Sequence, residues 1–231
     1  MKTLRIFGGG AVNGLVDSLR AAFEAEMACT LDGTYSAVGA MNARVVADEP
    51  VDVVILTRAL IDTLARDGHV VGASAADLGR VETAVAVRQG DAPPSVANAD
   101  GLRAALLAAD EIHLPDTEQS TAGIHIARVL RQLGLWDTVA ARLKTAPNGA
   151  TAMRALAQSK SARPIGSTQA TEILSTPGLA LVGSLPPGCD LATSYVAAVS
   201  TRSQTPDAAA RLVALLGDAK GRDARRRLGF V

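Results

Sequence analysis

Short apolar runs alternate with helical patterns along almost the whole chain. The clearest apolar run is VDVVIL at residues 51–56, and the helical pattern that follows it ends at Gly68. This alternation is typical of α/β proteins with a mostly parallel sheet. It predicts strands at residues 4–7, 30–35, 51–56, 81–90, 111–114, 144–146, 164–167, 179–186 and 194–200. It predicts helices at residues 12–27, 39–47, 58–66, 99–109, 122–133, 149–158, 171–175 and 207–228, the last as one helix or two.

Two alternating apolar runs divide the chain into halves. TAVAV at residues 83–87 and YVAAV at residues 195–199 bracket the second half, so the chain is predicted to cross into a second lobe and return from it there. Lobe one then contains residues 1–83 and 195–231, and lobe two contains residues 84–194. Two lobes joined by two hinge strands close over a ligand through backbone changes at a few hinge residues. We therefore predict a two-lobed α/β fold, in which each lobe is a mixed, mostly parallel sheet flanked by helices.

Charge balance and composition argue against several classes of partner. The chain has 23 basic and 23 acidic residues and only 3% aromatic residues, which favours neither a nucleic-acid surface nor a stacking platform for bases. No apolar run is long enough to predict insertion into a membrane. Cys29 and Cys189 fit no metal-site spacing and no nucleotide fingerprint is complete, so no metal or cofactor is expected. The first residues lack the apolar region of a secretory signal, which predicts a cytoplasmic protein as the sequence stands, or a periplasmic one if a signal was removed.

Small residues mark four predicted junctions between a strand and a helix. The first N–H groups of a helix lack intrahelical acceptors and carry partial positive charge, and small residues let an anion approach them. If they faced each other across a cleft, these junctions would surround an oxyanion or a carboxylate with main-chain donors. Tight turns also use glycine without binding anything. The residues expected to bind the ligand here are Gly9, Gly10, Ala11, Val38, Gly39, Ser120, Thr121, Ala122, Gly149, Ala150 and Thr151.

Three further side chains are candidates for contact with the ligand. Arg58 follows the central strand, where a guanidinium would grip a carboxylate in bidentate fashion; otherwise it is a surface residue of its helix. Thr168 and Gln169, in the stretch GSTQATEI, follow another strand and are expected near the ligand. Thr168 would alternatively cap a helix, with Thr171 or Glu172 completing the capping box.

The order of these elements resembles the periplasmic molybdate-binding protein and its relatives among the type II solute-binding proteins of ABC transporters. IFGGGAVNGLVDSL, SAVGAMNARV and EPVDVVIL resemble segments of this family's first lobe, and LPDTEQSTAGIHIARVL resembles part of its second. The resemblance covers almost the whole chain and implies a small anion bound between two lobes, with an ABC permease as partner if the protein is exported. Molybdate-binding members use serine hydroxyls in the first two loops, and main-chain N–H groups and a tyrosine in lobe two. Here the serine positions read Ala11 and Val38 or Gly39, and residues 167–169 replace the tyrosine region, which favours a larger carboxylate ligand over molybdate.

The same fold would also support catalysis. Some proteins similar to this family are enzymes, and an aconitate isomerase-like enzyme would shift a proton on an unsaturated di- or tricarboxylate. That reaction requires a general acid or base beside the anion-binding junctions. The candidates are His113, His125, Glu118 and Glu172. His125 would otherwise fill a structural role, and His113 would point either toward the cleft or out to water.

Overall fold

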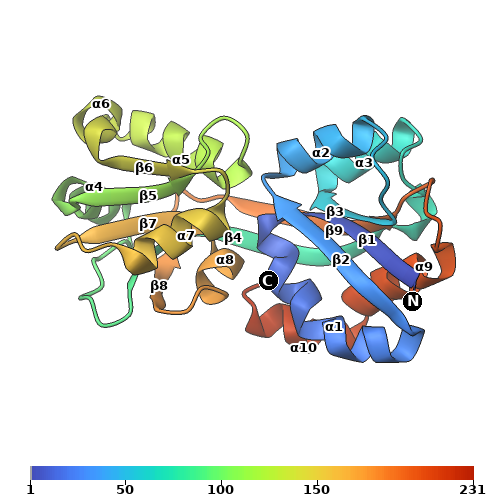
Figure 1. The fold of residues 1–231 in the computed structure, drawn as a ribbon. Helices are drawn as coiled ribbons and strands as arrows, with labels where there is room; N and C mark the ends of the chain where they lie inside the picture. The colour runs from blue at the N-terminus through green and yellow to red at the C-terminus, as the bar shows by residue number, and fades with distance from the viewer. Residues whose placement is uncertain (1) are drawn as a thin grey trace. The chain divides into compact units, whose positions relative to one another are not determined.

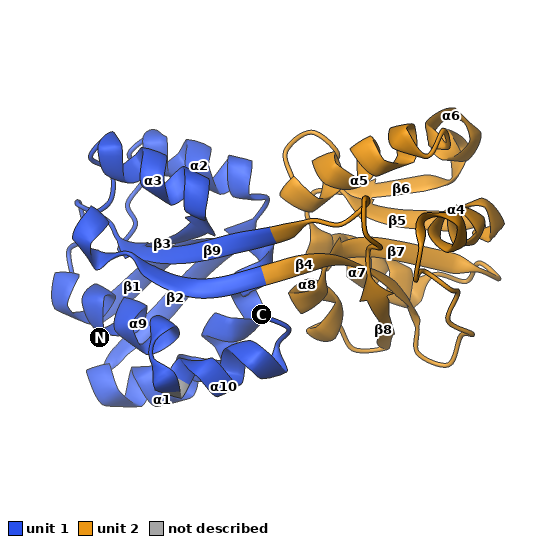
Figure 2. Cartoon of the chain, turned by 180° about the vertical axis from the view of Figure 1, so that it is seen from behind, with its two compact units in different colours: residues 1–80, 193–231 blue, residues 81–192 orange. Residues whose placement is uncertain are grey.

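The chain consists of two compact units. The computed structural model describes residues 2–231 (Figure 1), and Met1, with which the predicted first lobe begins, lies outside the described residues. Unit 1 contains residues 1–80 and 193–231, and unit 2 contains residues 81–192 (Figure 2). The chain passes between the units within β4 (Ala76–Arg88) and at the start of β9 (Ala192–Val199). The crossings predicted near residues 83 and 195 lie in these two strands.

Unit 1 is a sheet with helices on both faces. Its strand order is β2-β1-β3-β9-β4, in which β1, β2 and β3 are parallel and β9 is antiparallel to β3. Helices α2 and α3 lie on one face, and α1, α9 and α10 lie on the other (Figure 1). The elements of this unit besides β4 and β9 are β1 (Lys2–Gly9), η1 (Gly10–Val12), α1 (Asn13–Met27), β2 (Cys29–Ser36), α2 (Val38–Val46), β3 (Val53–Thr57), α3 (Arg58–Arg66), η2 (Gly72–Ser74), α9 (Pro206–Gly217) and α10 (Ala219–Arg227).

Apolar spacing and helix caps explain the helices of unit 1. Helix α1 buries Leu15, Val16 and Phe23 along one stripe, as the period of an amphipathic helix requires. The predicted C-terminal helix is two helices, because Asp218 adopts an extended backbone and its carboxylate accepts a hydrogen bond from the Gly221 N–H at 3.0 Å. That bond caps α10 and fixes where the first helix ends.

Unit 2 is a second sheet with its own helices. Its strand order is β4-β7-β5-β6, and β8 pairs with β4. Strands β5, β6 and β7 are parallel, whereas β4 is antiparallel to β7. The carboxyl ends of the three parallel strands therefore share one edge, and α5, α7 and α8 begin there. The elements are α4 (Ala99–Ala108), β5 (Glu111–Pro115), α5 (Thr121–Gln132), α6 (Trp136–Val139), η3 (Ala140–Arg142), β6 (Leu143–Ala146), α7 (Gly149–Gln158), β7 (Pro164–Gln169), α8 (Ala170–Leu174) and β8 (Leu179–Ser184).

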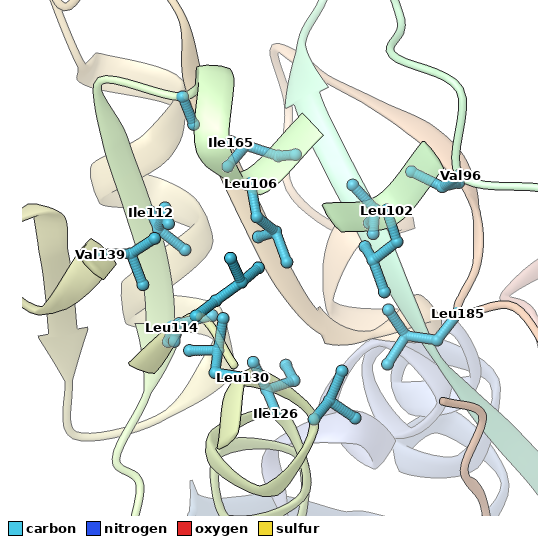
Figure 3. Close-up of a cluster of buried hydrophobic side chains, with 14 of the residues drawn as sticks. Val96, Leu102, Leu106, Ile112, Leu114, Ile126, Leu130, Val139, Ile165 and Leu185 are labelled. Carbon is cyan, nitrogen blue, oxygen red and sulfur yellow. The ribbon is translucent and has the colours of Figure 1, made fainter. Parts of the chain in front are cut away.

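The hydrophobic core of unit 2 lies between its sheet and helices α4, α5 and α6 (Figure 3). Ile112 and Leu114 of β5 are fully buried in this core. His113 lies between them in sequence, so its side chain projects from the opposite face of β5, against which α7 packs. Other members of the core are Val96, Leu102, Leu106, Ile126, Leu130, Val139, Ile165 and Leu185.

Two classes of feature are missing from residues 2–231. No helix in this range combines the length and the apolar character needed to cross a membrane. In the same range, histidine, cysteine and carboxylate side chains form no group of three or more that could hold a metal ion. Cys29 and Cys189 are both buried free thiols.

Candidate functional site

In unit 1, helices begin at the edge formed by the carboxyl ends of β1, β2 and β3. Gly10 and Ala11 open η1, and Val38 and Gly39 open α2. Within the described chain, no side chain caps the N-terminus of η1, α2 or α3. Because the first N–H groups of an α-helix have no intrahelical acceptor, α2 presents main-chain donors and partial positive charge at this edge. Ala11 and Val38 are buried, whereas Gly39 is exposed.

Close packing explains why residue 9 is a glycine. A Cβ atom at Gly9 would lie 2.8 Å from Val38 Cγ1 and 3.1 Å from Tyr195 Cε1. The end of β1 therefore approaches α2 and β9 with no space for a side chain. Glycine at this position serves the packing of unit 1 whether or not a ligand binds.

The Arg58 guanidinium already has two carboxylate partners in unit 1. Its Nη2 atom forms an ion pair with Asp77, and its Nη1 atom lies 3.8 Å from an oxygen of Asp62, one turn later in α3. The Arg58 side chain is 40% exposed, so these ion pairs contribute little to stability. This placement favours the alternative in which Arg58 is a surface residue of its helix, because a ligand carboxylate would have to compete with Asp77 for the guanidinium.

In unit 2, the N-terminus of α5 is only partly capped. The Ser120 hydroxyl accepts a hydrogen bond from the Gly123 N–H at 3.5 Å. Asp116 accepts hydrogen bonds from the two N–H groups of the preceding loop, at 2.8 Å each. Helix geometry gives the N–H groups of Thr121 and Ala122 no intrahelical acceptor. They are the donors that this junction offers to an anion.

Side chains of unit 2 accept hydrogen bonds from two N–H groups in the first turn of α7. The Asn148 side chain accepts a hydrogen bond from the Thr151 N–H at 2.9 Å. The N–H of the preceding residue, Ala150, donates to the carboxylate of Glu172. A Cβ atom at Gly149 would overlap the same carboxylate. The junction that was predicted to hold an external anion thus holds an internal one.

Glu172 is the most perturbed carboxyl group of this edge. Its carboxylate also accepts hydrogen bonds from the Thr168 hydroxyl, at 2.5 Å, and from the Gln169 N–H. Glu172 is the third residue of α8 and Gln169 is its N-cap, so the backbone bond is the glutamate half of a capping box. Burial raises the pKa of Glu172 to about 6, although the three hydrogen bonds act to lower it. The group therefore changes charge near pH 6, which is uncommon for a glutamate.

The two histidine candidates form hydrogen bonds within unit 2. His125 is buried in α5, and its Nε2 atom lies 2.8 Å from the carbonyl oxygen of Cys189, which ties the helix to a loop. His113 Nε2 lies 3.0 Å from Glu111 at the amino end of β5. Glu118 is exposed in the loop that precedes α5. Of the four acid or base candidates, Glu118 and Glu172 therefore lie at the carboxyl edge.

Thr168 and Gln169 are both buried at the end of β7, with Gln169 opposite Thr83 of β4. The Thr168 hydroxyl donates a hydrogen bond to Glu172, so it already has a partner within the chain. Sequence reasoning missed the Asn148 cap. An asparagine directly before a helical pattern is the signal that would have identified it.

Comparison with known proteins identifies a family model that matches the chain and a protein that is similar to it in sequence. Residues 4–231 match a family model described as bacterial extracellular solute-binding protein. The chain is 31% identical over 223 residues to an aconitate isomerase from Pseudomonas sp, which covers 93% of this chain and 82% of that protein.

Solved structures show the same fold. The periplasmic molybdate-binding protein of Azotobacter vinelandii aligns with a TM-score of 0.80 at 18% identity, over 99% of this chain and 98% of that chain. The sulfate-binding protein SubI of Mycobacterium tuberculosis H37Rv aligns with a TM-score of 0.77 at 16% identity, over 100% of this chain and 86% of that one. These likenesses confirm the predicted type II periplasmic-binding-protein fold and the resemblance to molybdate-binding relatives.

Proposed function

Because the chain belongs to the bacterial extracellular solute-binding protein family, we propose that it binds a small anion through helix N-termini and that this anion is a carboxylate. The observation that carries the proposal is that each sheet has, at its carboxyl edge, a helix whose N-terminus is not fully capped: α2 in unit 1 has no side-chain cap, and α5 in unit 2 has the Ser120 cap alone. Each supplies N–H donors and a positive dipole end, which together favour an anion.

The side chains at the two unit 1 junctions favour a carboxylate over a small inorganic oxyanion. Ala11 and Val38 present only methyl groups, so neither supplies a hydroxyl donor. Each charge-assisted hydrogen bond that a buried dianion forgoes costs about 1.5–3 kcal/mol. A di- or tricarboxylate distributes its charge over several groups, so a helix N-terminus that binds one group meets only part of the charge of the ligand.

The second candidate is an isomerase that acts on an unsaturated di- or tricarboxylate, favoured by the 31% identity to aconitate isomerase. Such a reaction holds the carboxylates with fixed donors and moves one proton between carbons through an acid or base side chain. Glu118 and Glu172 lie at the carboxyl edge of the unit 2 sheet, where this role would require an acid or a base. His113 and His125 form hydrogen bonds elsewhere in unit 2. A carrier role would place the protein outside the cytoplasm with an ABC permease as partner, and the isomerase role requires neither.

One assay separates the two candidates. Wild-type protein is mixed with cis- or trans-aconitate, binding is measured by calorimetry, and conversion is followed by ultraviolet absorbance. Binding with conversion supports the isomerase, and binding without conversion supports the carrier. If calorimetry with these and with saturated di- and tricarboxylates gives no heat of binding, the carboxylate proposal is wrong.

Thr121→Pro tests the role of α5 directly. Proline fits the first position of a helix and removes only the N–H that has no intrahelical acceptor. Ser120 before it already has the extended backbone (φ −90°, ψ 131°) that proline requires of its neighbour. Losing one charge-assisted donor should weaken carboxylate binding about tenfold or more.

Thr121→Ala is the matched control, because it removes the side chain and keeps the N–H. It should bind the carboxylate nearly as wild type does, and both variants should keep the far-ultraviolet circular dichroism of the parent. Equal affinities for the proline and alanine variants would show that α5 does not contact the ligand through this donor.

A further inference from the structure

The N-terminus of α7 differs from that of α5 in one respect. Both helices follow a parallel strand and start at the same edge of the unit 2 sheet, and both have a polar N-cap, Ser120 or Asn148. Only α7 also has a buried carboxylate on its first turn, because the Ala150 N–H donates to Glu172. An anion at a helix N-terminus satisfies the unpaired donors and the dipole together. In α7 that anion is part of the chain.

The contacts of Glu172 fix its carboxylate in this position. The Thr168 hydroxyl donates to Oε2 at 2.5 Å, and the Gln169 N–H donates from the start of α8. The space that a side chain at residue 149 would need is filled by Glu172 Oε2 and Thr168 Oγ1. Glycine at residue 149 is therefore what lets the carboxylate approach the α7 backbone this closely. The Glu172 carboxylate therefore occupies the position from which an external anion would accept the Ala150 N–H hydrogen bond.

We propose that Glu172 is an internal anion that occupies the anion-binding position of α7 and thereby selects against small inorganic oxyanions. A tetrahedral oxyanion needs donors around its whole surface, and with α7 closed it loses those of one helix. It would also lie close to a like charge, which repels it strongly in a poorly solvated site. A carboxylate group has only two oxygens to satisfy, so it can bind at the α5 donors without those of α7. The inference deepens the proposed function and rests on it.

Two substitutions at residue 172 test the inference with sodium sulfate and sodium molybdate as probes. Glu172→Ala removes both the charge and the volume, and should increase sulfate affinity about tenfold or more over wild type, which corresponds to one gained charge-assisted contact. Glu172→Gln keeps the volume and removes the charge, so it should increase sulfate affinity by a smaller factor. Molybdate should follow the same order in calorimetric titrations. Equal sulfate affinities for wild type and both variants would overturn the inference.

Amide chemical shifts locate any gained binding. In Glu172→Ala, sulfate should shift the backbone N–H resonances of Ala150 and Gln169, the two donors that the carboxylate releases. Shifts confined to other helices would contradict the assignment even if sulfate affinity rises. Should Glu172→Ala not fold, the affinity of Glu172→Gln decides the question alone.

The outcomes for this inference and for the proposed function are distinguishable. Wild-type protein that binds a carboxylate, together with variants that gain no sulfate affinity, contradicts only the role of Glu172. Wild-type protein that binds no carboxylate contradicts the proposed function, whatever the variants do with sulfate.

Discussion

Replacing Glu172 by glutamine should change how the stability of unit 2 depends on pH. Burial raises the pKa of this carboxyl from its ordinary 4.5 to about 6, in spite of the hydrogen bonds from Thr168 and from two backbone N–H groups. The folded protein therefore binds this proton more tightly than the unfolded chain does. The stabilisation is fully present below the ordinary pKa and is lost as pH rises through the folded value. A difference of about 1.5 units corresponds to about 2 kcal/mol.

Urea unfolding at a series of pH values measures this effect. Trp136 is the single tryptophan of the chain and lies in α6 of unit 2, so its fluorescence follows the unfolding of that unit. The quantity of interest is the unfolding free energy of wild type minus that of Glu172→Gln. It should fall by about 2 kcal/mol between about pH 4 and about pH 7.

A control and a clear contrary outcome complete the experiment. Glu118→Gln removes one carboxylate from the exposed loop of the same unit, and so controls for the loss of a negative charge. If the unfolding free energy of wild type minus that of Glu172→Gln stays constant across this range, burial does not dominate the pKa of Glu172. A difference that rises with pH would show that the hydrogen bonds outweigh burial.

Two further predictions concern the two units separately. Asp52 accepts hydrogen bonds from the Arg5 N–H at 2.8 Å and from the loop at residues 203–205; burial opposes ionisation, but these bonds lower the pKa of Asp52. Asp52→Ala should cost about 3 kcal/mol of unfolding free energy in urea at neutral pH. The difference in unfolding free energy between wild type and Asp52→Ala should become smaller as pH falls below 3.8, the ordinary pKa of an aspartate. A difference that becomes larger in acid would contradict the lowered pKa. In unit 2, a methyl at Gly123 would overlap a backbone carbonyl of the preceding loop, so Gly123→Ala should destabilise α5 by about 2–3 kcal/mol in thermal melts. Gly183→Ala, whose methyl meets its nearest neighbour at 3.6 Å, is the control and should melt close to wild type.

Local sequence patterns located most elements of the fold. The apolar run predicted as a strand at residues 51–56 is β3, and the helical pattern after it is α3 with the same bounds, 58–66. Less regular segments were harder to bound. Strand β4 begins at Ala76, five residues before the predicted start, because alternation there is interrupted by Gly79 (φ 104°). The short helix α6 was not predicted, since four residues are too few to establish a period.

The candidate site, too, was predicted from the sequence only in part. The sequence indicated which junctions carry small residues, and α2, α5 and α7 do begin there. It could not show which N–H groups already have partners. Arg58 pairs with Asp77, and His125 contacts the Cys189 carbonyl across 64 residues of chain. Pairings of this kind depend on how distant segments pack.

The sequence alone determined that this is an α/β chain with a type II solute-binding order of elements, because hydrophobic period and turn residues act over a few positions at a time. Only the tertiary structure decided that the first turn of α7 donates to a carboxylate from another helix, whereas α5 has only the cap from the adjacent Ser120. The donor is the N–H of Ala150 and the acceptor is the carboxylate of Glu172, brought together by the packing of α7 against α8. Whether a helix N-terminus is available to a ligand depends on such a contact, which no local pattern encodes.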